Sequence, residues 1–178
     1  RFGGTNLDKF LLLEAESSIE ARGEFHAALD AITGGTFELE KASDAIKNNE
    51  VVVRAAVAKS WKTLAFASDE LKDNEAVVLA AVSEDERALE FAGRAARNNE
   101  RVVLAAVTQN GEALKFASDE LKDSKDVALA AVTQSWEALK FVGDNMKNSE
   151  AVMVVAVSQH WELLKTASET MKNNEAVV

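Results

Sequence analysis

Residues Ala106–Val132, AVTQNGEALKFASDELKDSKDVALAAV, decide how this chain folds, because most of the remaining sequence repeats them. When the chain is compared with itself at a shift of 25 residues, the same pattern returns from Leu39 onwards. Five full copies and a shorter sixth copy each begin at a leucine. These leucines are Leu39, Leu64, Leu89, Leu114, Leu139 and Leu164. A fixed period of this length indicates an architecture of stacked repeats.

The first half of each copy has the residue spacing of an α-helix. In the copy that begins at Leu64, small and apolar residues follow three, four and seven positions later, at Ala67, Ser68 and Leu71. Positions with these separations lie on one face of a helix. A phenylalanine widens this face in four copies, at Phe66, Phe91, Phe116 and Phe141. The pattern therefore predicts one helix of about ten residues, with small side chains that let neighbouring helices approach closely.

The second half of each copy opens with an asparagine or an aspartate. These residues are Asn48, Asp73, Asn98, Asp123, Asn148 and Asn173. Both residue types are favoured at the N-cap of a helix, and the acidic residue that usually follows two positions later suits the positive end of the helix dipole. The valine-rich run after them, such as Ala76–Val82, is apolar on all sides. It therefore predicts a second helix that is buried on all sides.

A valine-rich run of this length is also compatible with a β-strand, so a solenoid of alternating strands and helices is the competing fold. The run lacks the alternation of a strand, and its paired alanines favour a helix. A residue of the helix-capping type also precedes it. We therefore predict an all-α fold, an α-solenoid of 25-residue repeats with two short helices each. Such short helices are stabilised by stacking on their neighbours.

Residues 1–38 depart from the repeat, and we expect them to form an N-terminal capping helix and a degenerate half-repeat. Thr5 and Asp8 predict a capping box, followed by a helix that ends at Gly23. Ile32 then stands where Val57 stands in the next copy. Residues 39–178 hold the five full copies and the partial sixth. Because the sixth copy is cut short and would leave an unfinished helix with an exposed apolar edge, we expect the protein to be longer or this end to be covered by a partner.

The composition excludes several classes of function. The net charge is -10, from 20 basic and 30 acidic side chains. Such a surface repels phosphate and anionic lipid, which argues against nucleic acid and membrane surfaces as partners. The longest apolar runs have seven residues, whereas a transmembrane helix needs about 20, so we expect no transmembrane segment. The chain has no cysteine, which fits an intracellular or organellar compartment, a plastid included, without fixing it.

The recurring pattern, ALKFASDEL followed in each copy by a run such as AVVLAAV, resembles the short repeats of the family known as domain of unknown function 4116. The resemblance covers about residues 32–178. It implies a tandem helical-repeat fold and brings no catalytic residues. Such repeats occur in bacterial secreted proteins and in algae and other protists, where an interaction role is the usual interpretation. The chain departs from its own pattern at Arg54, in a column of Leu and Val, and at Lys125 and Asp126.

One column outside the predicted core holds three tryptophans. In chain order it reads Trp61, Glu86, Gly111, Trp136 and Trp161. Because glutamate and glycine also occupy this column, we interpret it as lying outside the core. Exposed aromatic side chains often anchor interfaces, so Trp61, Trp136 and Trp161 are the candidate partner-binding residues. The alternative is that each ring packs locally on the adjacent turn.

A basic residue closes each first helix. These residues are Lys47, Lys72, Arg97, Lys122, Lys147 and Lys172. A row of cations is compatible with an anionic partner. However, a cation is favourable at the C-terminal end of any helix, and most of these residues follow an acid by three positions, as Lys72 follows Asp69. We therefore expect them to stabilise their own helices.

No group of residues predicts catalysis. His26 and Asp30 have i,i+4 spacing but lack a third metal ligand, and His160 occupies a helix-start position that other copies fill with Ser, Asp or Asn. Neither histidine belongs to a nucleophile motif, and the two glycines at 34 and 35 lack the spacing of a phosphate-binding loop. The sequence therefore predicts no enzyme and no catalytic, cofactor-binding or metal-binding residue.

The leading functional hypothesis is a non-catalytic helical-repeat scaffold or linker subunit that binds several other proteins of a larger complex. If the source is an alga, its partners are expected to be light-harvesting proteins of the plastid. One alternative is a targeting module of a larger secreted effector whose catalytic domain lies outside this segment. Another is a pigment- or metal-binding protein that uses His26 and His160.

Overall fold

The computed structural model describes the backbone of residues 6–165 and 167–177, and the side chains of residues 20–165, 167–169 and 171–177. Within these ranges the regular elements are all helices, so the predicted all-α class is confirmed. None of the described helices combines the length and the apolar character needed to cross a membrane.

Each full copy contains three helices of different kinds. The longer α-helices are α3 (Glu50–Val57), α5 (Glu75–Glu84), α7 (Glu100–Gln109), α9 (Lys125–Gln134) and α11 (Glu150–Gln159). The 3₁₀ helices are η1 (Leu39–Lys41), η2 (Trp61–Phe66), η3 (Glu86–Phe91), η4 (Gly111–Phe116), η5 (Trp136–Phe141) and η6 (Trp161–Lys165). The short α-helices are α2 (Asp44–Lys47), α4 (Asp69–Lys72), α6 (Arg94–Arg97), α8 (Asp119–Lys122), α10 (Asp144–Lys147) and α12 (Glu169–Lys172).

The single first helix predicted for each copy is wrong, because the chain bends in its middle. In the second copy η2 ends at Phe66, Ala67 is extended with φ -66° and ψ 160°, and α4 begins at Asp69. Ser68 causes the break, since its extended backbone and hydroxyl cap the new helix at the N–H of Leu71, 3.2 Å away. The apolar spacing nevertheless identified Leu64, Ala67 and Leu71 as buried, whereas Phe66, predicted to widen the same face, is 40% exposed.

The predicted caps of the second helix are displaced by one residue. Asn48 and Asp73 end the short helices, with their backbone N–H groups bonded to carbonyl oxygens of that helix. The N-caps of α3 and α5 are the next residues, Asn49 and Asn74. Their side chains accept hydrogen bonds from the N–H groups of Val52 and Val77. In these two copies the first of two successive Asn or Asp residues is therefore the C-cap of the short helix, and the second is the N-cap of the longer helix.

The N-terminal helix α1 (Asn6–Gly34) is one continuous helix, so its predicted end at Gly23 is wrong. Glycine in a helix interior costs only about 1 kcal/mol relative to alanine, which does not by itself break a helix. The helix ends at Gly34, and the φ of +75° at the following Gly35 lets Thr36 N–H reach the carbonyl of Ala31 at 2.9 Å. The predicted capping box of Thr5 and Asp8 lies outside the described side chains.

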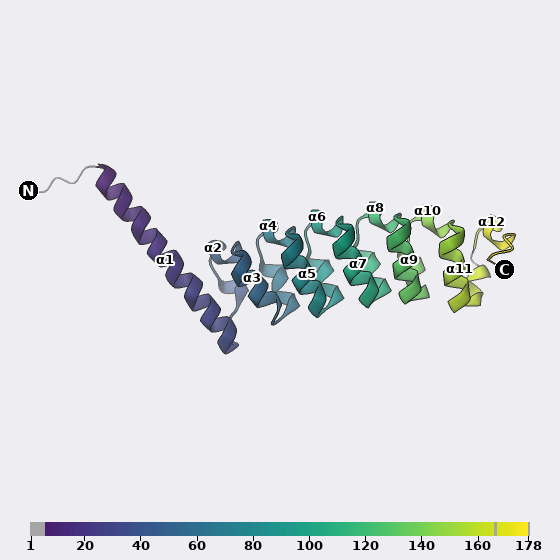
Figure 1. The fold of residues 1–178 in the computed structure, drawn as a ribbon, viewed down its shortest axis with the longest axis horizontal. Helices are drawn as coiled ribbons and strands as arrows, with labels where there is room; N and C mark the ends of the chain where they lie inside the picture. The colour runs from purple at the N-terminus through teal and green to yellow at the C-terminus, as the bar shows by residue number, and fades with distance from the viewer. Residues whose placement is uncertain (1–5, 166, 178) are drawn as a thin grey trace, which may run out of the picture.

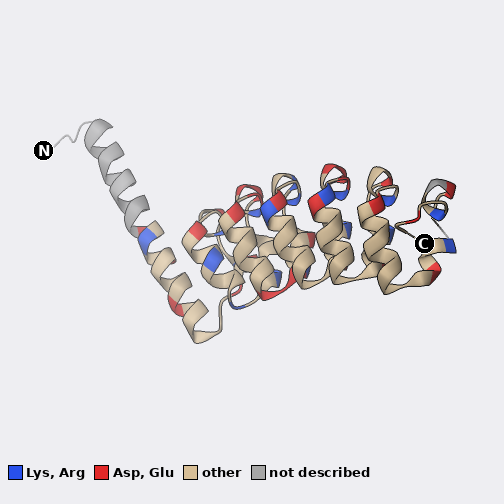
Figure 2. Cartoon of the chain, turned by 45° about the vertical axis from the view of Figure 1, so that its right-hand side comes forward, with Lys and Arg blue, Asp and Glu red and all other residues tan. Residues whose placement is uncertain are grey.

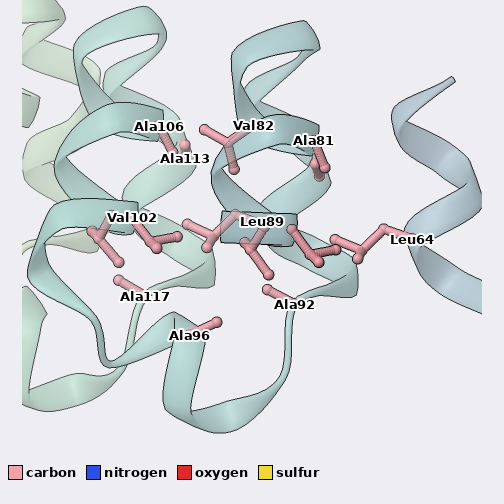
Figure 3. Close-up of a cluster of buried hydrophobic side chains, with 14 of the residues drawn as sticks. Leu64, Ala81, Val82, Leu89, Ala92, Ala96, Val102, Ala106, Ala113 and Ala117 are labelled. Carbon is pink, nitrogen blue, oxygen red and sulfur yellow. The ribbon is translucent and has the colours of Figure 1, made fainter. Parts of the chain in front are cut away.

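The longer helices stand side by side in one row, and the 3₁₀ helices form a second layer against them (Figure 1). The core lies between the two layers. The first four repeat leucines after residue 38 are at most 1% exposed, and valines of the row pack against them. Figure 3 shows Leu64, Leu89 and Val102 in this continuous core, which runs from copy to copy. Each copy thus covers apolar surface of its neighbours, which compensates for the marginal stability of short helices.

The copies are joined by two kinds of polar junction that alternate along the row. At four successive junctions a cap residue donates its backbone N–H to the preceding short helix, as Ser68 does to Lys47 O at 3.0 Å and Gly93 to Lys72 O at 2.8 Å. At two of these junctions the cap is a serine, whose hydroxyl caps its own helix and donates to an asparagine of the preceding copy. These pairs are Ser68 with Asn48, and Ser118 with Asn98.

Where the cap is glycine, an aspartate of the preceding copy replaces the missing hydroxyl. Asp73 Oδ1 accepts the N–H of Ala96 at 3.0 Å, and Asp123 Oδ1 accepts the N–H of Asn145 at 3.2 Å. A Cβ atom on Gly93 would lie 2.1 Å from Asp73 Oδ1. Aspartate therefore accompanies glycine and asparagine accompanies serine, so the structural unit of this array is a pair of copies.

Candidate protein-interaction surface

The longer helices leave one side partly exposed, so the prediction that they are buried on all sides is wrong. In α5 the residues Val77, Val78, Ala81 and Val82 are buried against the 3₁₀ layer. Leu79 and its neighbour Ala80 pack against the edge of the core but remain partly exposed. The physical reason is that the longer helices form a single row, so that nothing in the described chain covers their outer face.

The same outward positions recur in four helices and form a continuous surface, which we call the apolar band. It consists of Leu79, Ala80, Leu104, Ala105, Leu129, Ala130, Val154 and Val155. All eight side chains are partly exposed. Charged residues lie mainly on the short helices and at the helix ends, which leaves the middle of this row uncharged (Figure 2).

Hydroxyl groups border the band where the helices end. The hydroxyls of Ser83, Thr108 and Ser158 each donate to a carbonyl of their own helix, at 2.7–2.8 Å. Because these hydroxyl groups already donate hydrogen bonds within their own helices, they do not need a hydrogen-bond acceptor from a partner. The band therefore presents a smooth aliphatic surface rather than a hydrogen-bonding one.

Charges border the band where the helices begin. Arg54, which stands in the column of Leu79, pairs with Glu50 at 3.6 Å. Arg101 pairs with Glu75 across two helices at 2.7 Å. Between the two arginines lies an open hollow of about 640 Å³, lined in part by Leu79 and Ala80. Arg54 thus interrupts the aliphatic column in the first copy, and the band starts at α5.

The three tryptophans do not form one exposed ridge. The Trp61 ring is partly buried and stacks on Phe91, with ring centroids 5.8 Å apart. The Arg87 guanidinium lies 5.1 Å from the Trp61 centroid and also donates to Asp85 at 2.8 Å. This hydrogen bond lowers the pKa of Asp85. Trp61 is therefore part of a local cluster that joins two copies. This agrees with the alternative that the ring packs locally instead of being exposed for a partner.

Trp136 and Trp161 differ in exposure although they are one repeat apart. The Trp136 ring is partly buried and lies against His160, with centroids 4.4 Å apart. It also lines a groove of about 630 Å³ with Leu139, Met153 and other residues of the last two copies. Trp161 is 65% exposed, with Lys165 Nζ 4.8 Å from its centroid. Of the three candidates, only Trp161 has the exposure that its predicted role requires.

Gly111 shows that the tryptophan column is not outside the core in every copy. A Cβ atom there would lie 2.3 Å from the backbone oxygen of Ala131 in the next copy. The Gly111 N–H donates to Gln134 Oε1 at 2.6 Å, and Gln134 Nε2 reaches the carbonyl of Gln109 at 3.2 Å. The glycine therefore permits a close approach of two backbones, and our interpretation of this column as exterior is wrong at this copy.

The exposure difference makes a prediction for the two C-terminal tryptophans. Changing Trp136 to alanine is expected to lower the free energy of unfolding by about 1–3 kcal/mol, because a partly buried ring loses its contacts. Changing Trp161 to alanine should alter it by no more than about 0.5 kcal/mol. Thermal melts of both variants, followed by circular dichroism, measure the difference. Equal losses would show that Trp161 is packed in solution.

Several of the remaining candidates have local partners. The basic residues Lys72, Lys122, Lys147 and Lys172 each pair with the acid three residues earlier, at 2.8–3.8 Å. His26 Nδ1 lies 2.8 Å from the carbonyl of Arg22 in α1, whereas His160 lies at the start of η6. His26 belongs to α1 and His160 caps the C-terminal end of α11, and Figure 1 shows these two helices at opposite ends of the row. Within the described residues, no three His, Cys, Asp or Glu side chains form a group that could hold a metal ion.

Comparison with known proteins agrees with this architecture. The model of a family described as domain of unknown function DUF4116 matches residues 52–94 and 99–147, which together make up more than half of the chain. Each match spans almost two 25-residue copies, in keeping with junctions that alternate from copy to copy. No curated protein and no solved structure matches the chain. On the strength of the two tandem matches, the chain belongs to the DUF4116 family, a family of proteins whose function is unknown.

Proposed function

We propose that this protein is a non-catalytic interaction scaffold that binds other proteins along the apolar band. The observation that carries the proposal is a continuous, uncharged aliphatic surface over four consecutive copies. Contiguous exposed apolar surface is uncommon on soluble proteins outside sites of interaction. A linear array also offers equivalent positions to more than one partner, which suits a linker subunit of a larger assembly.

The arrangement of the polar side chains supports a non-catalytic role. The surface ion pairs of the lysines and arginines join residues of the same copy or of neighbouring copies. Catalytic sites instead bring together groups with strongly shifted pKa values in a pocket. Here the shift at Asp85 has a simple structural cause, its hydrogen bonds with Arg87 beside Trp61.

A cross-linking experiment tests the proposal. A photoreactive benzoylphenylalanine is placed at Leu104, in the centre of the band, or at Ala95, an exposed residue of α6. After irradiation in an extract of the native source, cross-linked proteins are identified by mass spectrometry. We expect defined partners from position 104 and none of them from position 95. The same proteins at both positions, or none at 104, would contradict the proposal.

Charges placed in the band provide a quantitative prediction. The double substitution Leu104→Glu and Leu129→Glu is expected to weaken capture of the cross-linked partner at least about tenfold, since it desolvates two carboxylates against an apolar surface. Both side chains are partly exposed, so helical content should be retained. The measurement is co-purification of the partner together with the circular dichroism spectrum of each variant.

A matched control carries the same added charge elsewhere. In Ala65→Glu and Ala95→Glu each new glutamate stands where another copy already has one, at Glu90 and at Glu70. The control should bind the partner as the unmodified protein does. If it weakens binding equally, the total charge rather than the band determines capture, and the proposal fails.

The identity of the partner distinguishes the possible settings of the scaffold. Light-harvesting proteins would assign it to the plastid assembly considered above. Host proteins captured by a longer secreted chain would assign it to an effector, in which the same band serves as the targeting surface. The proposal that the band is the binding surface holds in both settings.

A further inference from the structure

We propose that the segment bound by the apolar band is an amphipathic α-helix with one basic edge, lying across α5, α7, α9 and α11. The inference rests on the proposed function and adds the shape and the charge of the partner. It follows from two features of the band, namely the spacing of its side chains and the charges along its border.

The spacing of the band matches a helix. One large, partly exposed side chain lies on each of three successive helices, at Leu79, Leu104 and Leu129, and a small alanine follows each of them. Because large and small side chains alternate along the band, we expect shallow hollows beside the alanines. Packed helices lie about 8–10 Å apart, so the hollows recur at that interval.

A crossing helix can fill these hollows in register. Seven residues of an α-helix rise about 10.5 Å, close to the interval between the hollows. Apolar residues at heptad positions, with others three or four residues on, then meet successive copies. Side chains on one face of a β-strand recur every ~6.7 Å, which brings them out of step with the hollows after one copy.

The border charges specify a basic edge. The two arginines at this border are already paired, Arg54 with Glu50 and Arg101 with Glu75. In the part of the chain that the structure describes, four charged border residues make no ion pair. They are Glu100, Asp126, Glu150 and Lys125. Three acids against one cation favour a partner that carries lysine or arginine along this edge.

The same charges disfavour a second copy of this chain as the occupant. Each chain carries a net charge of -10, so face-to-face pairing would bring two acidic molecules together. A basic helix instead reduces the net charge of the complex. Its association is also accelerated by attraction at low salt.

Binding of designed peptides tests the proposal. Three labelled 21-residue peptides, each about 31 Å long as a helix, are compared by fluorescence anisotropy at 50 mM and 300 mM salt. Two share leucines at heptad positions and differ only in one flank, which is lysine or glutamate. The third is a scramble of the lysine peptide. We expect the lysine peptide to bind at least about tenfold more tightly than either of the others, with weaker binding at the higher salt.

Variants of the protein locate the bound peptide. Leu104→Glu with Leu129→Glu should weaken binding of the lysine peptide at least about tenfold, and the Ala65→Glu, Ala95→Glu control should leave it unchanged. Glu100→Gln with Asp126→Asn should weaken it several-fold and reduce its salt dependence. If the leucine variant shows altered circular dichroism, Ala105→Glu replaces it, because this small side chain contributes less to packing.

Each other outcome overturns the inference. Equal binding of the lysine and glutamate peptides would contradict the basic edge of the partner. Peptide binding that is unchanged in the band variants would show that the peptide does not bind at the band. A dimer in light scattering that Leu104→Glu with Leu129→Glu dissociates would assign the band to a second copy. Cross-linking from Leu104 to a native partner tests the proposed function separately, so that function stands if only the peptides fail.

Discussion

Changing Gly111 to alanine is expected to lower the free energy of unfolding by about 3 kcal/mol, because the new methyl group has no room. The Cβ position lies 2.3 Å from the carbonyl oxygen of Ala131, a backbone atom of the next copy, and 3.2 Å from the Cβ of Ala138. Neither atom can rotate away. Alanine is otherwise favoured over glycine within a helix, so a loss reports the steric conflict alone. Denaturant titration followed by circular dichroism measures it.

The neighbouring copy supplies the control for Gly111. Glu86 stands in the same column, and its side chain accepts a hydrogen bond from Asn110 Nδ2 at 2.9 Å. Changing Glu86 to alanine should cost about 1 kcal/mol or less, the loss of one solvent-accessible hydrogen bond. Gly111→Trp, which introduces the residue of three other copies, should be more damaging than Gly111→Ala. Tolerance of both changes would mean that the copies separate easily at this junction.

The sequence predicted which residues are buried better than it predicted where helices begin and end. The leucine and valine columns and the all-α class follow from periodicity, and the structure confirms them for residues such as Leu64 and Val77. The break at Ser68 could not be seen in the same way, since a serine between apolar residues fits both a helix interior and a cap. The contacts that favour the cap come from the preceding copy, where Lys47 and Asn48 bond to Ser68.

The apolar band could not be derived from residue types alone. Leu79 and Val78 are both aliphatic neighbours in one run, yet Val78 is buried and Leu79 is partly exposed. Their difference depends on the number of layers in the fold, because a second layer on the outer side would have covered Leu79. The tryptophans attracted attention by their size, although Trp61 and Trp136 are used in contacts between copies.

The alternating junctions are visible in the sequence once the structure shows which positions touch. Asn48, Asn98 and Asn148 precede serine caps by 20 residues, and Asp73 and Asp123 precede glycine caps by the same distance. Neither column shows this pairing by itself, since one alternates between asparagine and aspartate and the other between serine and glycine. The pairing of columns is what identifies a unit of two copies.

Changing Asp73 to alanine is therefore expected to destabilise the protein by about 1–2 kcal/mol, the usual cost of losing an N-cap. Asp73 Oδ1 accepts a hydrogen bond from the N–H of Ala96 in the next copy, and the N-cap Gly93 has no side chain that could accept it instead. The matched change at a serine junction, Asn98→Ala, should cost less. There Ser118 still caps the N–H of Leu121 in its own helix. Urea unfolding of the two variants gives the comparison.

A second substitution should restore the lost cap. Asp73→Ala removes the carboxylate that would lie 2.1 Å from a Cβ atom at residue 93, and Gly93→Ser then supplies a hydroxyl at the N-cap, the arrangement that Ser68 has with Leu71. The double variant is expected to recover most of the stability lost in Asp73→Ala, and the pair should show a coupling of about 1 kcal/mol in a double-mutant cycle. If Gly93→Ser has the same effect whether residue 73 is aspartate or alanine, the carboxylate is not acting as the cap. The two-copy unit would then describe the sequence without contributing to the stability of the array.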